Sequence, residues 1–333
     1  MHSEYNRILG TLVGCAIGDA MGMPGEMWSR SRIQRTFGQI RDFLPGHPQH
    51  EISAGFAPGE TTDDTIVTVL VAKALIRCQG DLPPLELVHS IENWARENAK
   101  SKTVIGPSTQ RAFQQIANGV PPEQAGRTGE TNGASMRISP VGIISDHRNL
   151  TKLVERVSQV CMATHNTATA IAAASAVAAA VAHGIAGLPL EDARACILEA
   201  AALGQQKGYE TCSPSVLERI RFSMELSDSI EDDETFMDRQ FSLVGCGLPS
   251  TESVPTAITI ALRCRGDMMR CARMCANIGG DTDTMGAIAC AITGAHVGIQ
   301  AIHAEVTEQI CAQNPFGFEE LAEQLLHLRE TQS

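Results

Sequence analysis

Apolar residues along most of the chain recur three and four positions apart, which is the spacing of one buried helix face. This spacing runs over residues 8–17 and again over residues 66–75, where Lys73 is the only polar member. It predicts eight further helices, over residues 150–163, 169–186, 190–203, 214–226, 254–263, 267–276, 285–302 and 318–328. Sustained alternation is nearly absent, since the segment MRISPVGII (136–144) is too short and too broken by proline to form a sheet. The pattern therefore predicts an all-α fold.

No serine-rich or glycine-rich linker, charge block or repeat divides the chain, so we expect residues 1–333 to form a single domain, a compact helical bundle. The longest irregular stretch, residues 37–60, contains three prolines and ends directly at the acidic motif TTDDT (61–65). A loop of this length in a helical domain is usually functional or mobile. The alanine-rich run 169–182 is too short and too weakly hydrophobic for a membrane span, so we expect it to be an interior helix.

The formal net charge of −12 argues against nucleic acid or an anionic membrane as partner, because both require a basic face, and it suits a protein that collects cations. The 11 cysteines form no C-x-x-C pair, and the first residues lack the pattern of a signal peptide. We therefore expect a reduced, cytoplasmic protein. Cys264, Cys271 and Cys275 share one helix face without a further cysteine or histidine nearby, which favours small apolar core residues over a zinc site.

Three short motifs place acidic residues near helix ends: GDAMGMPGE (18–26) ends the first helix, and TTDDT (61–65) and GGDTDT (279–284) each begin one. Capping would explain any one of them, because aspartate and threonine accept hydrogen bonds from the free N–H groups of a first turn. Together they offer more carboxylates than caps require. Like charges brought together repel and raise one another's pKa values unless cations neutralise them.

Carboxylate and hydroxyl oxygens, without sulfur or imidazole, are the ligands that hard divalent ions prefer. Adjacent side chains at a helix start point about 100° apart, so Asp63 and Asp64 can address two different ions. Asp281 and Asp283 can do the same from the opposite side. We therefore expect a two-metal centre with ions about 3.5–4 Å apart.

Six motifs occur in a definite order along the chain: the three acidic motifs together with NGASMR (132–137), THN (164–166) and ESVPTAI (252–258). This order is typical of the ADP-ribosylglycohydrolases, a family that includes the dinitrogenase reductase-activating glycohydrolases and the ADP-ribosyl-serine and ADP-ribosyl-arginine hydrolases. The chain resembles this family over roughly residues 7–302. The resemblance implies an all-α orthogonal bundle with two Mg²⁺ or Mn²⁺ ions. It also implies a substrate in which ADP-ribose is joined to a side chain through a glycosidic bond that water cleaves.

Matching the motifs carries the family's roles onto numbered residues of this chain. The implied metal ligands are Thr62, Asp63, Asp64, Asp281, Asp283 and Thr284. The implied catalytic residues are Glu26, Asp64 and Asp281, and Glu26 matches a glutamate on a movable flap in family members. The implied substrate contacts are Asp63, Gly129, Glu130, Thr131, Asn132, Gly133, His165 and Leu248.

The chemistry is consistent with these assignments. Departure of the leaving group builds positive charge on the ribose, and a carboxylate such as Glu26 can stabilise that charge or remove a proton from water. The sequence does not decide whether Glu26 is base, gate or both. The small residues of the loop 127–137 can aim backbone N–H groups at a diphosphate.

Some features depart from the family pattern. Val104 stands where nitrogenase-regulating members carry an acidic residue. The motif ESVPTAI is more similar to the serine-linkage branch of the family. Aromatic residues that could sandwich an adenine ring are scarce in the whole chain. Three alternatives to an ADP-ribosyl hydrolase therefore stay open: a hydrolase of a smaller ribosyl compound, a non-catalytic binding protein and a phosphoester hydrolase. The partners we expect are an ADP-ribosylated protein or a small ribosyl compound, with no nucleic acid and no membrane. We expect a monomer or a weak homo-oligomer.

Overall fold

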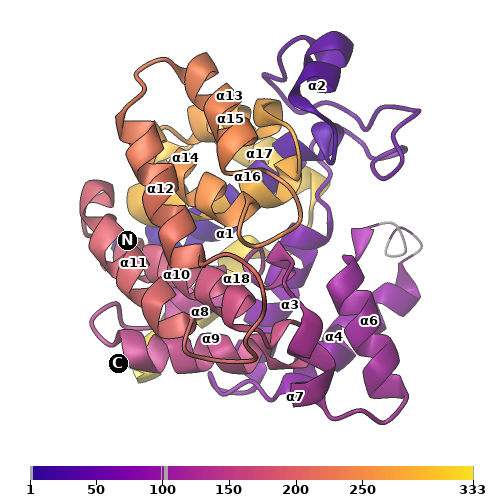
Figure 1. Ribbon diagram of the computed structural model, residues 1–333, viewed down its shortest axis with the longest axis vertical. Coiled ribbons are helices and arrows are strands. Elements are labelled where there is room, and N and C mark those ends of the chain that lie inside the picture. The colour runs from indigo at the N-terminus through magenta and orange to yellow at the C-terminus, as the bar shows by residue number, and fades with distance from the viewer. Residues whose placement is uncertain (1–2, 99, 101–103, 333) are drawn as a thin grey trace.

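Two antiparallel helices, α1 (Ser3–Gly22) and α16 (Thr282–Val297), form the centre of the protein in a computed structural model that describes residues 3–98, 100 and 104–332 (Figure 1). Both helices are buried along almost their whole length, on every side. A helix that is apolar all round belongs in the interior of a protein.

Glycines at intervals of four residues let the backbones of α1 and α16 touch. Facing residues along the two helices are Gly10 and Gly294, Gly14 and Cys290, Gly18 and Gly286, and Gly22 and Thr282. A Cβ atom added at Gly18 would lie 1.9 Å from the carbonyl oxygen of Gly286, and one added at Gly14 would lie 2.4 Å from that of Cys290. No side chain can be accommodated at these distances, so glycine is required at both positions.

The alanine-rich helix α10 (Ala168–Ile185) packs against α16 on one side of the central pair. It also contacts α8 (Ser139–Ile144), α9 (Leu150–His165) and α11 (Ala193–Gly204). Two segments are long and apolar enough to cross a membrane by length and composition, residues 3–25 and α10, but 100% and 94% of their apolar windows are buried inside the protein. The prediction of an interior helix over the alanine-rich run is therefore confirmed.

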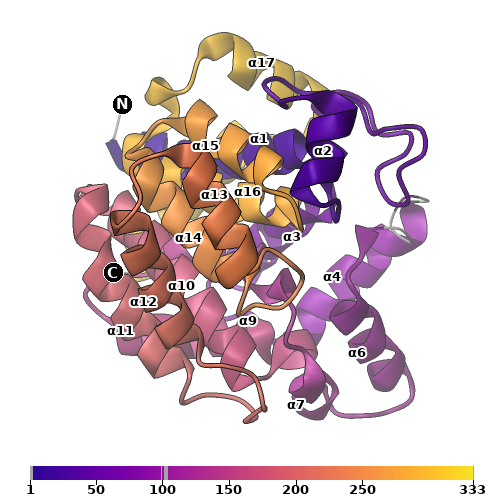
Figure 2. The same ribbon diagram turned by 45° about the horizontal axis from the view of Figure 1, so that its top comes forward.

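The remaining helices cover this centre. Those packed around α1 and α16 are α3 (Asp63–Arg77), α14 (Ser253–Cys264), α15 (Met268–Ile278) and α18 (Phe318–Gln332). The outer ones are α2 (Arg30–Phe37), α4 (Pro84–Glu97), α6 (Pro107–Ala117), α7 (Pro122–Ala125), α12 (Val216–Asp228), α13 (Asp233–Leu243) and α17 (Ala304–Gln313). Figure 2 shows α4, α6 and α7 on one side of the central pair and α11 to α13 on the other.

The all-α prediction is confirmed, since β-structure in the described part of the chain is limited to three isolated bridges. Each predicted helix is present, but the prediction of one helix over 285–302 is wrong at its end. α16 stops at Val297 because Gly298 adopts a φ of 75°, and a separate 3-10 turn, η5 (Ile299–Ala301), follows. The 11 cysteines are all free, and Cys264, Cys271 and Cys275 are buried core residues as expected. The prediction that the three share one helix face is wrong, because Cys264 is the last residue of α14, whereas Cys271 and Cys275 lie on α15.

Several short outer helices escaped the periodicity analysis. α2 buries only Ile33 and α17 buries only Ile310, so neither has an apolar stripe for a pattern search to find. Residues 38–60 contain no helix, as predicted, but Phe37, where the predicted irregular stretch begins, is the last residue of α2.

Substituting Gly14 by alanine tests the close contact of the central helices. Although alanine favours an isolated helix by up to about 1 kcal/mol, the overlap with the Cys290 carbonyl should lower the free energy of unfolding by about 2–3 kcal/mol. Urea denaturation gives this quantity directly. Gly106→Ala is the matched control, because no heavy atom of the described residues lies within 4 Å of its added Cβ, and its effect should stay within about 0.5 kcal/mol. Equal changes in the free energy of unfolding for the two substitutions would contradict the close contact between α1 and α16 at Gly14.

Candidate functional site

The three acidic motifs meet at one end of the central helix pair. α1 ends at Gly22, directly against Thr282 at the start of α16, and the Thr282 hydroxyl donates to the Gly22 carbonyl over 2.7 Å. The chain then passes through a 3-10 turn, η1 (Met23–Gly25), to Glu26. The antiparallel packing therefore places residues 18–26 beside residues 279–284.

Asp19 joins the third motif to this end. Its carboxylate accepts hydrogen bonds from the Thr62 N–H and hydroxyl, both at 3.0 Å, and from the Thr65 N–H at 3.0 Å and hydroxyl at 2.6 Å. Burial raises the pKa of Asp19 to about 6, although these hydrogen bonds act to lower it. No role was predicted for Asp19 from the sequence. Its signal was a carboxylate within the mostly apolar and buried run of residues 8–22 of α1.

Two groups of carboxylates have oxygen atoms within 4.8 Å of one another. One consists of Asp19, Asp64 and Asp283, and the other of Glu26, Asp281 and Asp283. Asp283 thus belongs to both groups, whereas Asp63 belongs to neither and lies next to Asp64 at the start of α3. Residues that are more than 200 positions apart in the sequence are therefore close neighbours in the fold.

These carboxylates are costly to hold as anions. Burial raises the pKa of Asp64 and of Asp283 well above the usual value, and repulsion from neighbouring carboxylates raises both further. The same two causes, in the same order, raise the pKa of Glu26 and of Asp63. None of the six carboxylates forms an ion pair with a lysine or arginine among the described residues.

The donor set fits a pair of hard divalent cations. Asp64 Oδ1 and Glu26 Oε2 are buried and have no hydrogen-bond partner within the described part of the chain, so both are free to bind an ion. The Thr62 hydroxyl lies 3.0 Å from both Asp19 Oδ1 and Asp64 Oδ2 and shares its one hydrogen between them, and the Thr284 N–H donates to Asp283 Oδ1 over 2.9 Å. Two of the carboxylates are thereby oriented, and every available ligand atom is oxygen.

The predicted substrate loop is attached to this cluster by Asn132. The Asn132 side-chain amide donates to Asp281 Oδ2 over 2.5 Å and to the Ser253 hydroxyl over 2.9 Å. Its backbone N–H donates to the Leu248 carbonyl over 2.9 Å. The structure thus brings the loop and the segment around Leu248 to the same side of the carboxylates.

His165 lies behind the loop and is fully buried. Its Nε2 is 2.9 Å from the Thr131 hydroxyl, and its Nδ1 is 2.8 Å from the Thr164 hydroxyl. Burial, followed by the nearby Arg137 guanidinium, lowers the pKa of His165 well below its usual value, so the ring is neutral. In this arrangement His165 supports Thr131, and its contact with a substrate stays a prediction.

Close backbone approach fixes the rest of the loop. A Cβ atom at Gly129 would lie 2.1 Å from the Thr164 carbonyl oxygen, and one at Gly133 would lie 3.2 Å from the His165 ring. Glu130 accepts a hydrogen bond from the Ser213 hydroxyl over 2.5 Å. The loop is therefore held from both sides in one conformation.

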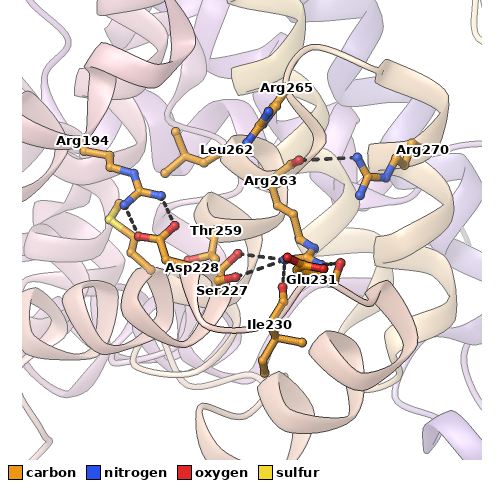
Figure 3. A pocket seen from close by; sticks show the side chains of 11 residues that line it. Arg194, Ser227, Asp228, Ile230, Glu231, Thr259, Leu262, Arg263, Arg265 and Arg270 are labelled. Atoms are coloured by element: carbon orange, nitrogen blue, oxygen red, sulfur yellow. Dashed lines mark hydrogen bonds and ion pairs between the residues drawn. The ribbon is translucent and has the colours of Figure 1, made fainter.

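A separate hollow of about 440 Å³ lies beside α11, α12 and α14, and none of the predicted site residues lines it (Figure 3). It contains four arginines, but Arg194 is paired with Asp228, and Arg263 and Arg270 both pair with Asp233. The positive charge of this hollow is thus largely neutralised. Only the exposed Arg265 has no ion pair among the described residues, and a single guanidinium at the surface does not make a phosphate site.

The raised pKa values predict how pH and metal affect stability. In metal-free protein the free energy of unfolding should fall as pH rises from about 4, because the folded state holds protons that the unfolded state releases. For Asp19 this loss runs from its ordinary pKa of 3.8 to its folded pKa of about 6. Excess Mg²⁺ or Mn²⁺ should restore stability, by about 2.7 kcal/mol at a hundredfold excess over Kd. The gain should be larger at pH 7.5 than at pH 5, since protons compete for the ligands.

Thermal unfolding in EDTA and in excess MgCl₂ or MnCl₂, at both pH values, measures these effects. If the melting temperature at pH 7.5 were the same in EDTA and in excess metal, the proposal that this cluster binds cations would be contradicted. CaCl₂ at equal concentration controls for ionic strength and reports selectivity by ion size.

Comparison with known proteins identifies similar chains. The uncharacterized protein YegU of Escherichia coli (strain K12) is 36% identical over 328 residues, which cover 98% of each chain. ADP-ribosylhydrolase ARH3 of Bos taurus is 26% identical over 350 residues, 95% of this chain and 90% of that protein. A solved structure titled ADP-ribosylglycohydrolase-related protein complex has the same fold, with a TM-score of 0.72 at 23% identity over 99% of this chain and 100% of that chain.

The family model of ADP-ribosylglycohydrolase matches residues 1–333. This match and the 36% identity to YegU cover nearly the whole chain. The chain therefore belongs to the ADP-ribosylglycohydrolase family.

Proposed function

We propose that this chain is a metal-dependent hydrolase that cleaves the N- or O-glycosidic bond of an ADP-ribosylated substrate and releases ADP-ribose. The observation that supports this most strongly is the meeting of Glu26, Asp281 and Asp283 in one carboxylate group, to which the Asn132 amide is bonded. In such a site a residue that can accept or donate a proton, Glu26, lies beside two carboxylates that can bind cations, Asp281 and Asp283. The substrate is either an ADP-ribosylated protein or a small ADP-ribosyl compound.

Two Mg²⁺ or Mn²⁺ ions would be held by oxygen ligands from both helix starts. The residues proposed to hold them are Thr62, Asp63, Asp64, Asp281, Asp283 and Thr284. When bound, such ions supply positive charge that grips hydroxyl oxygens and lowers the pKa of water. The two ribose hydroxyls are the groups that this charge would fix.

The chain's own residues supply the remaining chemistry. Glu26 has one buried oxygen without a partner and a raised pKa, so it can accept a proton from water or stabilise a cationic ribose. Asp64 and Asp281 are proposed to be catalytic residues together with Glu26. The Asn132 amide holds the Asp281 carboxylate in place. The backbone of residues 129–133 is proposed to bind the diphosphate, and Leu248 is proposed to line the adenosine side.

A second candidate, a hydrolase of a smaller ribosyl compound, is favoured by the aromatic residues near the site. Trp28 is only 3% exposed and stacks on Phe37 and His50, with ring centroids 5.9 and 4.6 Å away. It is therefore not available to stack on adenine. Incubation with ADP-ribosyl-arginine, ADP-ribosyl-serine and a panel of nucleosides, followed by chromatography of the products, distinguishes the two functions. Release of ADP-ribose supports the first, and release of a free base from a nucleoside alone supports the second.

Asp283→Asn tests the metal centre, because Asp283 belongs to both carboxylate groups. Turnover should fall by about 10²–10³-fold or more, as when a preorganised electrostatic group is removed. Metal affinity should fall as well, while the fold survives. Asp228→Asn is the matched control, since Asp228 only pairs with Arg194 at the surface and its loss should leave turnover unchanged. Full activity of Asp283→Asn after chelation and readdition of Mg²⁺ would show that the site is wrongly assigned.

Glu26→Gln separates proton chemistry from metal binding. Glutamine keeps the shape of the side chain but cannot accept a proton, so turnover should drop by about 10²-fold or more. Metal affinity, measured by calorimetric titration with Mn²⁺, should change much less. Losses of equal size in turnover and affinity would make Glu26 a metal ligand instead.

A further inference from the structure

His50 connects the long irregular segment 38–60 to the backbone of Glu26. Its ring is 4% exposed, and its Nε2 lies 2.9 Å from the Glu26 carbonyl oxygen. Its Nδ1 lies 3.0 Å from the backbone nitrogen of Ile52 and 3.0 Å from that of Ser53. Both ring nitrogens are thus engaged with backbone groups.

The partners determine which nitrogen carries the proton. The N–H groups of Ile52 and Ser53 can only donate, so Nδ1 accepts and carries no hydrogen. The Glu26 carbonyl can only accept, so Nε2 carries the hydrogen and donates it. His50 is therefore a neutral ring in one tautomer, and the loop turn at 50–53 orients its donor toward Glu26.

The same ring contacts Trp28, two residues beyond Glu26. The His50 and Trp28 rings stack with centroids 4.6 Å apart and an interplanar angle of 22°. On the Trp28 ring also lies the Arg32 guanidinium, 3.8 Å from the centroid. His50 thus contacts the chain on both sides of Met27.

Met27 has a φ of 56°, which is unfavourable for a residue other than glycine. Such a conformation persists only where the surroundings hold it. On one side the Met27 N–H donates to the Gly280 carbonyl over 2.7 Å, and the Gly280 N–H donates to the Trp28 carbonyl over 2.8 Å. On the other side stands the hydrogen bond from His50. Glu26 is therefore held between the start of the GGDTDT motif and the 38–60 segment.

We propose that His50 is a positioning residue that fixes the catalytic carboxylate of Glu26 by clamping its backbone carbonyl. The inference rests on the proposed function, since that function gives Glu26 its catalytic part. The proposal also gives a function to the 38–60 segment, which positions the His50 side chain against the Glu26 carbonyl.

His50→Asn removes the clamp and keeps the local turn. The asparagine oxygen can replace Nδ1 as acceptor for Ile52 and Ser53, but the side chain is too short to donate to Glu26. His47→Asn is the matched control. The His47 ring also contacts Trp28, at 5.6 Å, and its Nδ1 accepts from the backbone of Gln49, but it makes no bond to Glu26.

Hydrogen exchange measured by mass spectrometry reports on the clamp without any substrate. His50→Asn should speed exchange at residues 26–28, whereas His47→Asn should leave it as in the wild type. Turnover of the ADP-ribosyl substrate by His50→Asn should fall about tenfold in kcat with little change in KM, since a displaced group loses its alignment with the reacting atoms.

A double-mutant cycle with Glu26→Gln shows whether His50 acts through Glu26. If it does, His50→Asn should reduce kcat little further in the Glu26→Gln background. If the kcat losses of the two single variants multiplied in the double variant, the proposal would be overturned, because His50 would then have a general structural role that does not act through Glu26. Unchanged exchange at residues 26–28 in His50→Asn would overturn it as well. If the wild type cleaves no ribosyl compound, the proposed function fails separately, and the exchange comparison alone decides whether His50 holds this segment.

Discussion

The contact between the backbones of α1 and α16 is the constraint on which the rest of the structure depends. Glycines face the opposite backbone at every fourth position, so the two helix backbones pack in direct contact. At the last contact, a Cβ on Gly22 would lie 2.2 Å from the Thr282 carbonyl oxygen. The carboxylates that follow α1 and those that open α16 are consequently placed against each other by the core itself. A binding site built on rigid helices in this way needs little reorganisation when a ligand arrives.

The site works against the stability of the fold that holds it. Burial and mutual repulsion raise the pKa of Asp64 and Asp283, so a metal-free protein at neutral pH must either retain protons there or tolerate repulsion. The apolar helices around the site offset this cost. A cluster that is unfavourable alone and satisfied by cations is the expected compromise between stability and function at a binding site.

The interior helices could be predicted from the sequence because their buried faces impose a spacing, whereas α2 and α17 each bury a single residue and leave no such trace. The acidic motifs were informative because they hold more carboxylates than capping requires. Their convergence was inferred from this excess of oxygen ligands and from the family resemblance, and not from spacing. Asp19 was missed because its hydrogen bonds to the first turn of α3 exist only once the helices are packed. The contact between His50 and Glu26 was missed because His50 lies in a loop, where residues have no periodic spacing that would indicate their neighbours.

The histidine at 165 shows another limit of sequence reasoning. A pattern can indicate that His165 lies near the loop, but not that its ring is fully buried behind Thr131. Direct observation of the cations tests the central claim. Crystals soaked in MnCl₂ and measured at the manganese absorption edge should show two anomalous peaks, each contacted by carboxylates from the starts of both α3 and α16. Peaks elsewhere only, or none at this end of the central helices, would contradict the account.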